Sequence, residues 1–465
     1  MTTTTPTDPD YIAHPSGELC TRDVRVGVAA AVAAVAFDAG VRSGVASLGG
    51  AFCIAVVAAG MAWTGRVRNR QAMAALALAP VFGSFLAVRM SPWLLLPDIA
   101  AAALLLLVGA SFSRSGSVLD LGIQGLVMPA WDVIRHALTA PAFLASSLPR
   151  ADRRWAAVVR GLLVAAPVIL VLGLLLASAD EVFASLFDVS LDGSVVLHVV
   201  LWAMGAWGMS ALLGLASSPA TVAPGVKASR LGQVETCMVL GSLVALYAAF
   251  VLAQVVGATA GGRHVLETAG LTYAEYARRG FFELLVVASI TLALLLALDN
   301  GTRLVRRLSL GAVALTLVIV AVAVRRLHLY EQAFGLTMLR LCSTVFALWV
   351  GAVFVLLAAR LAGVGRGRQW FTSAAVGVGL AVLLALNLLN PEAVVVQRNA
   401  ERPDFDPVHA LTLTPDAVPA LVEAGLGGDA CAWAEKFDQW DGWLAWNLSR
   451  ERATGACGSV RAGQP

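Results

Sequence analysis

The sequence contains few charged residues and almost no lysine. Asp, Glu, Lys and Arg make up only 14% of its 465 residues, and Lys227 and Lys436 are the only lysines among 33 basic residues. A soluble domain has about 25% charged residues, so composition excludes an ordinary soluble fold. The formal net charge of +3 is too small for the basic surface that nucleic-acid binding requires. We therefore expect no nucleic-acid partner.

Short motifs that carry metal or redox chemistry are also absent. The sequence has no Cys-x-x-Cys and no His-Glu-x-x-His, and its six histidines are scattered along the chain. Metal sites that can be recognised from sequence depend on such spacings. We therefore expect no metal and no cofactor, and the sequence favours a non-catalytic protein over an enzyme.

Long apolar segments dominate the chain instead. Hydrophobic residues make up 58% of it, and the mean hydropathy is +0.78. A helix needs about 17 to 25 residues to cross a hydrocarbon layer of ~30 Å. The sequence thus predicts an all-α fold, a polytopic transmembrane helical bundle of about eleven spans in a lipid bilayer. The predicted spans are Val24–Ala39, Ser43–Trp63, Gln71–Val88, Trp93–Ala110, Trp155–Ala177, Ser194–Ala216, Gly232–Gly257, Gly280–Leu298, Leu308–Val324, Thr337–Leu361 and Gln369–Leu389.

Three parts of the chain differ in composition. Residues 1–22 are polar and are expected to form a disordered cytoplasmic tail without a cleavable signal peptide. Residues 23–389 form the predicted transmembrane helical domain, and residues 390–465 a small extracytoplasmic helical tail rich in proline. Within the transmembrane domain, residues 118–148 are polar on one helical face and apolar on another, which favours an interfacial or re-entrant helix over a span.

Arginines predict the orientation of the chain. Loops on the cytoplasmic side of a multi-pass protein carry an excess of basic residues, and most loop arginines fall on the side of the amino terminus. We therefore expect a multi-pass protein of the bacterial cytoplasmic membrane with its amino terminus inside and its carboxyl terminus outside. The arginines on the poorer, outer side are Arg42, Arg89, Arg263, Arg278, Arg279, Arg325 and Arg326.

Polar residues gather at three places on this predicted outer face. They precede the eighth span, lie between the ninth and tenth spans, and follow the last span. A carboxylate beside lipid requires a partner, so we expect Glu283 or Glu331 to pair with Arg326 or Arg340. Each place alone also has a structural explanation, such as an Arg340 side chain that extends to the headgroups. The candidate ligand-binding or structural polar cluster is Tyr273, Glu275, Tyr276, Arg278, Arg279, Glu283, Arg325, Arg326, His328, Tyr330, Glu331, Arg340, Asn390, Arg398 and Asn399.

These segments also carry a family resemblance. Tyr273-x-x-Tyr-x-Arg-Arg-Gly-Phe-Phe-Glu-Leu, His328-x-Tyr-Glu-x-x-Phe-Gly-Leu-Thr-x-x-Arg340, Asn390-Pro with Arg398-Asn399, and Leu413-x-x-Asp-Ala-Val-Pro-Ala-Leu421 form the matching motifs. They resemble uncharacterised bacterial membrane proteins grouped under domains of unknown function, the 4153 and 4173 types. The resemblance covers roughly the second half of the chain. It implies a membrane fold but no activity, because those families have none assigned.

The predicted tail contains two cysteines, Cys431 and Cys457. An extracytoplasmic tail lies in an oxidising compartment, where disulfides form and persist. We therefore predict a disulfide between them.

The function favoured by these patterns is a non-catalytic envelope protein. It would bind an anionic lipid, another envelope ligand or a protein partner through the polar cluster, because clustered arginines suit anionic groups. A transporter or flippase is one alternative, suggested by the number of spans and by interruptions such as Pro167 and Gly173. A membrane enzyme acting on a lipid-linked substrate is the other, with Glu283 or Glu331 as base.

Overall fold

In the residues that it describes, the computed structural model consists of helices joined by turns and loops. The described residues are 24–113, 134–141, 143–144, 193–217, 232–259, 281–298, 302–365, 370–403, 407–437 and 442–463. Eight helices in this part of the chain are long and apolar enough to cross a membrane, and Leu48–Trp63 and Val286–Ala297 are shorter apolar helices. The protein is therefore a multi-pass membrane protein. The predicted span Trp155–Ala177, the predicted tail 1–22 and most of residues 118–148 lie outside the described residues.

Helix boundaries follow local sequence signals. Ser47 and Thr337 act as N-caps, with side chains that accept from the backbone N–H of Gly50 and Arg340. Such caps satisfy N–H groups that lack a partner in the first helical turn. At the opposite end of one long helix, Gly363 adopts the left-handed conformation (φ 98°), which is the usual glycine stop signal.

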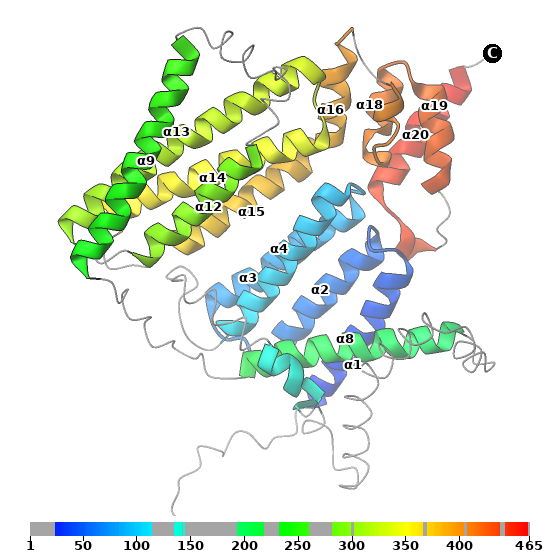
Figure 1. Cartoon of the computed structure of the whole chain (residues 1–465). Helices are drawn as coiled ribbons and strands as arrows, with labels where there is room; N and C mark the ends of the chain where they lie inside the picture. The colour runs from blue at the N-terminus through cyan, green and yellow to red at the C-terminus, as the bar shows by residue number, and fades with distance from the viewer. Residues whose placement is uncertain are drawn as a thin grey trace, which may run out of the picture.

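The amino-terminal helices form a first bundle, blue to cyan in Figure 1, with α8 in green. Alanines such as Ala29 and Ala33 make up much of its core, together with larger residues such as Phe82. A Cβ on Gly205 of α8 would lie 2.8 Å from the Cα of Ala34 in α1, so these two backbones approach closely. Small residues at helix contacts are the packing expected where lipid removes the hydrophobic driving force. The elements are α1 (Val24–Arg42), α2 (Leu48–Trp63), α3 (Arg70–Ser84), η1 (Phe85–Ala87), α4 (Pro92–Ser111) and α8 (Gly193–Ser217).

A second bundle contains the next described helices. Phe354 and Leu357 are at its centre. Helix α15 joins the two bundles, because Leu380 and Leu383 pack on the first core while Phe371 and Ala375 belong to the second. The elements are α9 (Gln233–Thr259), α12 (Phe281–Ala297), α13 (Arg303–Phe334), α14 (Met338–Ala362) and α15 (Phe371–Leu389).

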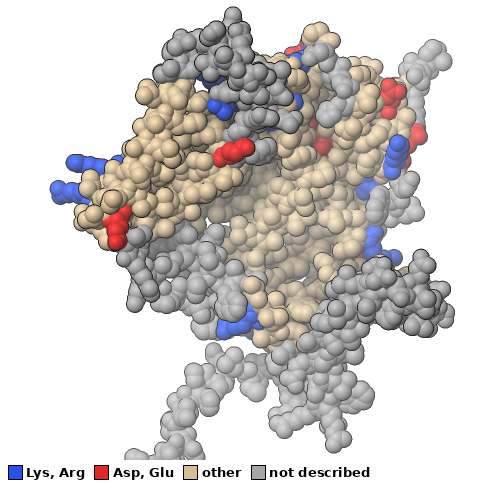
Figure 2. All heavy atoms as spheres, in the orientation of Figure 1, with Lys and Arg blue, Asp and Glu red and all other residues tan. Residues whose placement is uncertain are grey.

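Apolar side chains also cover the outside of both bundles. Val28, Val32 and Val35 form an exposed stripe along α1, and Met238 and Leu252 are exposed on α9. Figure 2 shows a broad uncharged surface over the helices, with charged residues mostly near helix ends. In a membrane protein such a surface faces lipid.

Part of the predicted interfacial segment is described. Residues 134–141 are helical, and Trp207 Nε1 of α8 donates a hydrogen bond to the Ala137 carbonyl at 2.5 Å. Ile134 and Leu138 are exposed. Whether the whole segment 118–148 lies in the interface stays a prediction.

A C-terminal unit, orange to red in Figure 1, packs against one end of the bundles. Its core includes Val396, Val418 and Leu421, and a disulfide joins Cys431 to Cys457 with their Cα atoms 5.5 Å apart. The backbone N–H of Leu48 donates to the Trp446 carbonyl at 2.8 Å, which attaches the unit to the start of α2. The elements are α16 (Pro391–Ala400), α17 (Pro407–Ala410), η2 (Pro415–Ala417), α18 (Val418–Glu423), α19 (Gly427–Ala434), η3 (Glu435–Phe437), η4 (Trp443–Ala445) and α20 (Leu448–Gly463).

Candidate functional site

The structure distributes the predicted polar cluster over several environments. Glu283 is exposed in the first turn of α12. Arg325 through Arg340 occupy the end of α13 and the start of α14, while Arg398 and Asn399 lie on α16. The remaining predicted members before α12 lie outside the described residues, namely Tyr273, Glu275, Tyr276, Arg278 and Arg279.

At the end of α13, arginines bind backbone carbonyls. Arg340 Nη1 donates to the carbonyls of Phe334, at 3.0 Å, and Gly335. The Arg340 guanidinium carbon lies 4.2 Å from the centre of the Tyr330 ring, within the range of a cation–π contact. The last carbonyls of a helix lack intrahelical partners and carry partial negative charge. Arg340 therefore stabilises the C-terminus of α13.

Helix α16 contributes to the same structure, which we call the α13 cap and define as Tyr330, Gly335, Leu336, Arg340, Asn399 and Arg402. Asn399 Nδ2 donates to the Leu336 carbonyl at 2.7 Å, and its Oδ1 accepts from the Leu336 N–H at 2.8 Å. Arg402 Nη1 donates to the Gln332 carbonyl at 2.9 Å. Gly335 has φ 75°, a conformation that favours glycine. The cap thus fixes the turn from α13 to α14 against α16.

Other members of the predicted cluster make local contacts. His328 Nδ1 lies 3.7 Å from Glu331 Oε2, and Arg326 Nη2 donates to Gln254 Oε1 of α9 at 3.0 Å. Arg325 and Arg398 are exposed. Pairing of Glu283 or Glu331 with Arg326 or Arg340 stays a prediction.

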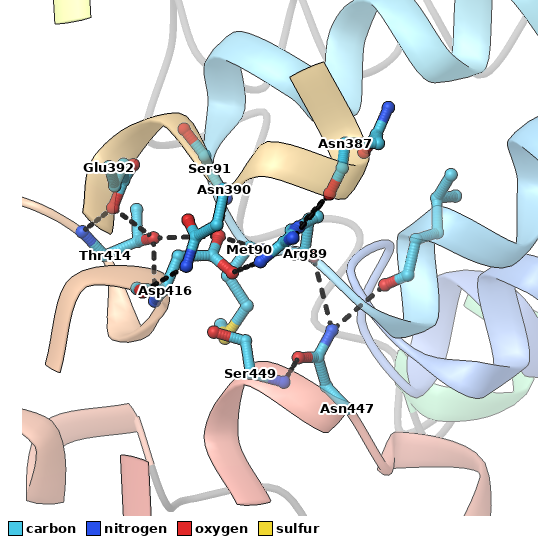
Figure 3. A network of polar contacts seen from close by, with 11 residues as sticks. Arg89, Met90, Ser91, Asn387, Asn390, Glu392, Thr414, Asp416, Asn447 and Ser449 are labelled. Atoms are coloured by element: carbon cyan, nitrogen blue, oxygen red, sulfur yellow. Dashed lines mark hydrogen bonds and ion pairs between the residues drawn. The ribbon is translucent and has the colours of Figure 1, made fainter. Parts of the chain in front are cut away.

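A second polar site, largely unforeseen from sequence, is buried where α4, α15 and the C-terminal unit meet. We call it the junction and define it as Arg89, Ser91, Asp98, Asn387, Asn390, Glu392, Thr414, Asp416 and Asn447; Figure 3 shows all of these except Asp98. Asp416 Oδ2 accepts from the backbone N–H groups of Met90, at 2.8 Å, and Ser91, at 2.9 Å. Its carboxylate therefore sits at the N-terminus of α4, where a helix favours negative charge.

Arg89 links the bundles to this carboxylate. Its Nη1 lies 3.5 Å from Asp416 Oδ1, and its Nε donates to the Asn387 carbonyl at 2.9 Å, with Nη2 on the same acceptor. That carbonyl belongs to the last turn of α15. Asn390, which follows α15 with φ 51°, donates from Nδ2 to the Asp416 carbonyl at 2.8 Å. One guanidinium thus connects the loop before α4, the end of α15 and the C-terminal unit.

Two more acidic residues are buried in the junction. Asp98 Oδ1, inside α4, accepts from Asn387 Nδ2 at 2.8 Å. Glu392 Oε2, on α16, accepts from the Thr414 N–H at 2.7 Å and from its hydroxyl at 2.8 Å. Burial raises the pKa of Glu392 above its ordinary value and the Asp416 carboxylate raises it further, while the bonds from Thr414 lower it. Burial is the largest of these influences, and it disfavours the charged form of the carboxyl.

Asn447 connects α20, the last described helix, to the first bundle through hydrogen bonds. Its buried Nδ2 lies within hydrogen-bond distance of the carbonyls of Ala46, Leu86 and Arg89, and its Oδ1 accepts from the Ser449 N–H at 2.8 Å as the N-cap of α20. The Asn-Leu-Ser triplet matches a glycosylation pattern, but the Asn447 amide is buried and engaged in these hydrogen bonds.

A pocket of about 330 Å³ lies in the C-terminal unit beside the disulfide. Glu435, Phe437, Arg450 and Thr454 are among its lining residues. Arg450 Nη2 also donates to the Ala445 carbonyl. A small polar ligand would fit the volume, although part of the charge of Arg450 is already engaged by the backbone.

The sequence marks individual residues of the junction as unusual, but it does not show that they lie together. Arg89 belongs to the arginines on the arginine-poor side, and Asp98 is a carboxylate inside a predicted span, a costly position that usually has a function. Asn390 is the one predicted site residue that belongs to the junction. Nothing local to Arg89 or Asp98 predicts contact with residues 387–447, because those contacts arise only in the folded chain.

Of three comparisons with known proteins, one found a match. No curated protein and no solved structure matches the chain. A family profile described as a domain of unknown function, DUF4153, matches residues 26–424. The match begins in α1, so the family extends well beyond the second half of the chain, where the motifs resemble it. It ends before Cys431, Asn447 and Cys457. The chain therefore belongs to the DUF4153 family of proteins with a domain of unknown function.

Proposed function

We propose that this multi-pass membrane protein is a non-catalytic protein of the cell envelope that binds anionic lipid headgroups at its outer end. In this proposal the amino terminus is cytoplasmic and the C-terminal unit is extracytoplasmic. Support comes from the arginine bias of the loops. It also comes from the disulfide, since such bonds persist in oxidising compartments. A protein partner at the same surface is the alternative outcome.

The observation that carries the proposal is that the arginines at the proposed outer end fall into two groups, one bound to backbone carbonyls and one exposed. Arg340 and Arg402 bind backbone carbonyls at the end of α13, whereas Arg325 and Arg398 are exposed. At 1.5 Å per residue, Arg325 lies about 33 Å along α13 from Arg303, close to the thickness of the hydrocarbon layer. If Arg303 lies at the cytoplasmic headgroups, this length supports a position for Arg325 among the outer headgroups, where a guanidinium binds phosphate well.

The test asks whether arginines at the outer end of the protein, and not those at the other end, make its thermal stability depend on anionic lipid. The melting temperature is measured in nanodiscs of phosphatidylglycerol and of phosphatidylcholine. We expect phosphatidylglycerol to stabilise the protein, and Arg325→Gln with Arg398→Gln to remove most of that difference. The matched control is Arg303→Gln with Arg307→Gln, exposed arginines at the start of α13. If the control removes as much of the difference as the outer pair, outer-end lipid binding is contradicted and a protein partner takes its place.

Orientation has a separate test. Reporter fusions after Arg68 and Arg306 should report a cytoplasmic location, and a fusion after Arg402 should report export. A cytoplasmic result at Arg402 would overturn the orientation and would require another span, such as residues 118–148.

A transporter is the second candidate function, and one observation favours it. Asp98 is a fully buried carboxyl inside a membrane-spanning helix, at the contact between the two bundles. Ionisable groups in such positions often mark ion pathways. Transport of a labelled anionic lipid between leaflets of proteoliposomes, lost in Asp98→Ala, would replace the lipid-binding proposal.

A further inference from the structure

The junction contains more buried acidic groups than buried cations. Asp98, Glu392 and Asp416 are 0%, 1% and 3% exposed, and Arg89, the guanidinium among them, is 5% exposed. Uncompensated charge is very unfavourable in such surroundings, and buried groups become neutral instead. Three carboxylates cannot all be ionised beside one arginine. At least one of the three must carry a proton.

Asp416 has the contacts of an ionised carboxylate. Two backbone N–H groups donate to it, and Arg89 lies beside its other oxygen. Hydrogen bonds and a positive neighbour both favour the charged form of an acid. Asp416 and Arg89 therefore neutralise one another.

Asp98 has the opposite surroundings. Its Oδ1 accepts from Asn387 Nδ2, but its Oδ2 is buried without a hydrogen-bond partner, and so is Asn387 Oδ1. Two facing side chains thus leave two acceptor oxygens without a donor. A buried polar atom without a partner is costly and requires an explanation. One proton on Asp98 Oδ2, donated to Asn387 Oδ1, would satisfy both atoms.

No other cation in the described helices around Asp98 lies where it could neutralise an ionised Asp98 carboxylate. Helices α2 and α15 contain no charged residue, Arg70 is the first residue of α3, and α8 carries only His198. His198 contacts Asp38 at 2.7 Å, and Arg42 donates to its other ring nitrogen. The nitrogens of Arg89 face the Asn387 carbonyl and Asp416.

We propose that Asp98 and Asn387 form a proton-binding site at the contact between the two bundles. The Asp98 carboxyl takes its proton from water, holds it on Oδ2 and donates it to Asn387 Oδ1, while Asn387 Nδ2 donates to Asp98 Oδ1. Release of the proton leaves a buried anion that competes with Asp416 for Arg89. Proton release therefore weakens the attachment of the C-terminal unit.

The first test compares two isosteric substitutions. Asp98→Asn keeps the shape of the neutral acid and supplies an N–H where the proton would be, so the protein should fold with an unchanged melting temperature at pH 6. Asp416→Asn, the matched control, removes an ionised acceptor and should lower the melting temperature clearly. If Asp98→Asn fails to fold, or loses more than Asp416→Asn, the proposal is overturned.

The second test detects the proton directly. Infrared difference spectra of the purified protein should show the carbonyl stretch of a neutral carboxyl, which disappears as pH is raised. The part of the band that comes from Asp98 should be missing in Asp98→Asn and present in Glu392→Gln. Wild-type protein should also lose stability as pH rises, because native protein holds a proton that the unfolded chain releases, and Asp98→Asn should reduce that loss. A spectrum of Asp98→Asn identical to wild type contradicts the assignment.

Discussion

The junction and the α13 cap lie at the same end of the molecule and both use arginine and asparagine, but they bind different partners. In the α13 cap, Arg340 and Arg402 bind carbonyls of a single helix end. In the junction, Arg89 is buried against an acidic residue more than 300 positions away in sequence. A partly exposed arginine that loses its carbonyl acceptors can form hydrogen bonds to water instead. Loss of one member of a buried ion pair leaves the other as an uncompensated buried charge. The density of charge in the sequence therefore does not indicate where charge matters most for stability.

The largest expected effect is loss of one member of the buried pair. Arg89→Met should reduce the free energy of unfolding by about 3 to 5 kcal/mol, because Asp416 would stay buried without its cation. The double variant Arg89→Met with Asp416→Leu should be less damaging than the sum of the two single variants. Unfolding by denaturing detergent provides the measurement, and Arg303→Met at an exposed site is the control. Additive losses would contradict direct pairing.

Removal of the disulfide should come next. Cys431→Ser with Cys457→Ser opens a loop of 26 residues, for which chain entropy predicts about 3 kcal/mol. The effect should be confined to the C-terminal unit and appear as faster proteolysis there. Cys237→Ser, a cysteine of α9 without a disulfide, should leave the digestion pattern unchanged. Equal digestion of both variants would show that the bond does not stabilise the unit.

A smaller loss is expected in the α13 cap. Asn399→Ala removes both hydrogen bonds to Leu336 and should cost about 1 to 3 kcal/mol, less than Arg89→Met. Gln397→Ala, at an exposed position on the same helix, is the control. A loss as large as that of Arg89→Met would remove the distinction between the two regions.

The smallest expected effect is coupling between Glu283 and Arg340. A pair of these residues would give non-additive losses in a double-mutant cycle. Because Arg340 contacts carbonyls and the Tyr330 ring, we expect Glu283→Gln and Arg340→Gln to be additive within about 0.5 kcal/mol. Thermal stability in detergent is the measurement. Strong coupling would confirm the pairing expected from sequence, which stays a prediction.

Sequence alone was sufficient for the helical class and for many helix positions. The lengths of the apolar segments predict the bounds of α1 and α15 to within a few residues. Asn390-Pro391 marks the end of α15, since proline favours the first position of the following helix. The path of α13 was less predictable. It continues to Phe334, beyond the predicted span end at Val324, because polar residues can extend a helix out of the apolar layer.

The partners of the site residues could not be predicted in the same way. Arg340 follows Glu331 by nine positions in sequence, and only the folded chain shows that its side chain donates to backbone carbonyls. For Asp98, the apolar neighbours indicated a span but gave no sign of Asn387, which is 289 positions away. Such contacts depend on how bundles meet, which no local period or motif encodes.

The attachment of Asn447 and Asp416 to the first bundle has a consequence for biosynthesis. The carbonyl of Ala46 and the N–H of Met90 emerge from the ribosome early, but their partners lie 401 and 326 positions later. Contacts of such long range form late in folding. The amino-terminal helices therefore lie in the bilayer with Arg89 unpaired until Asp416, near the end of the chain, has been synthesised. Quality-control proteases have that interval in which to recognise a truncated product.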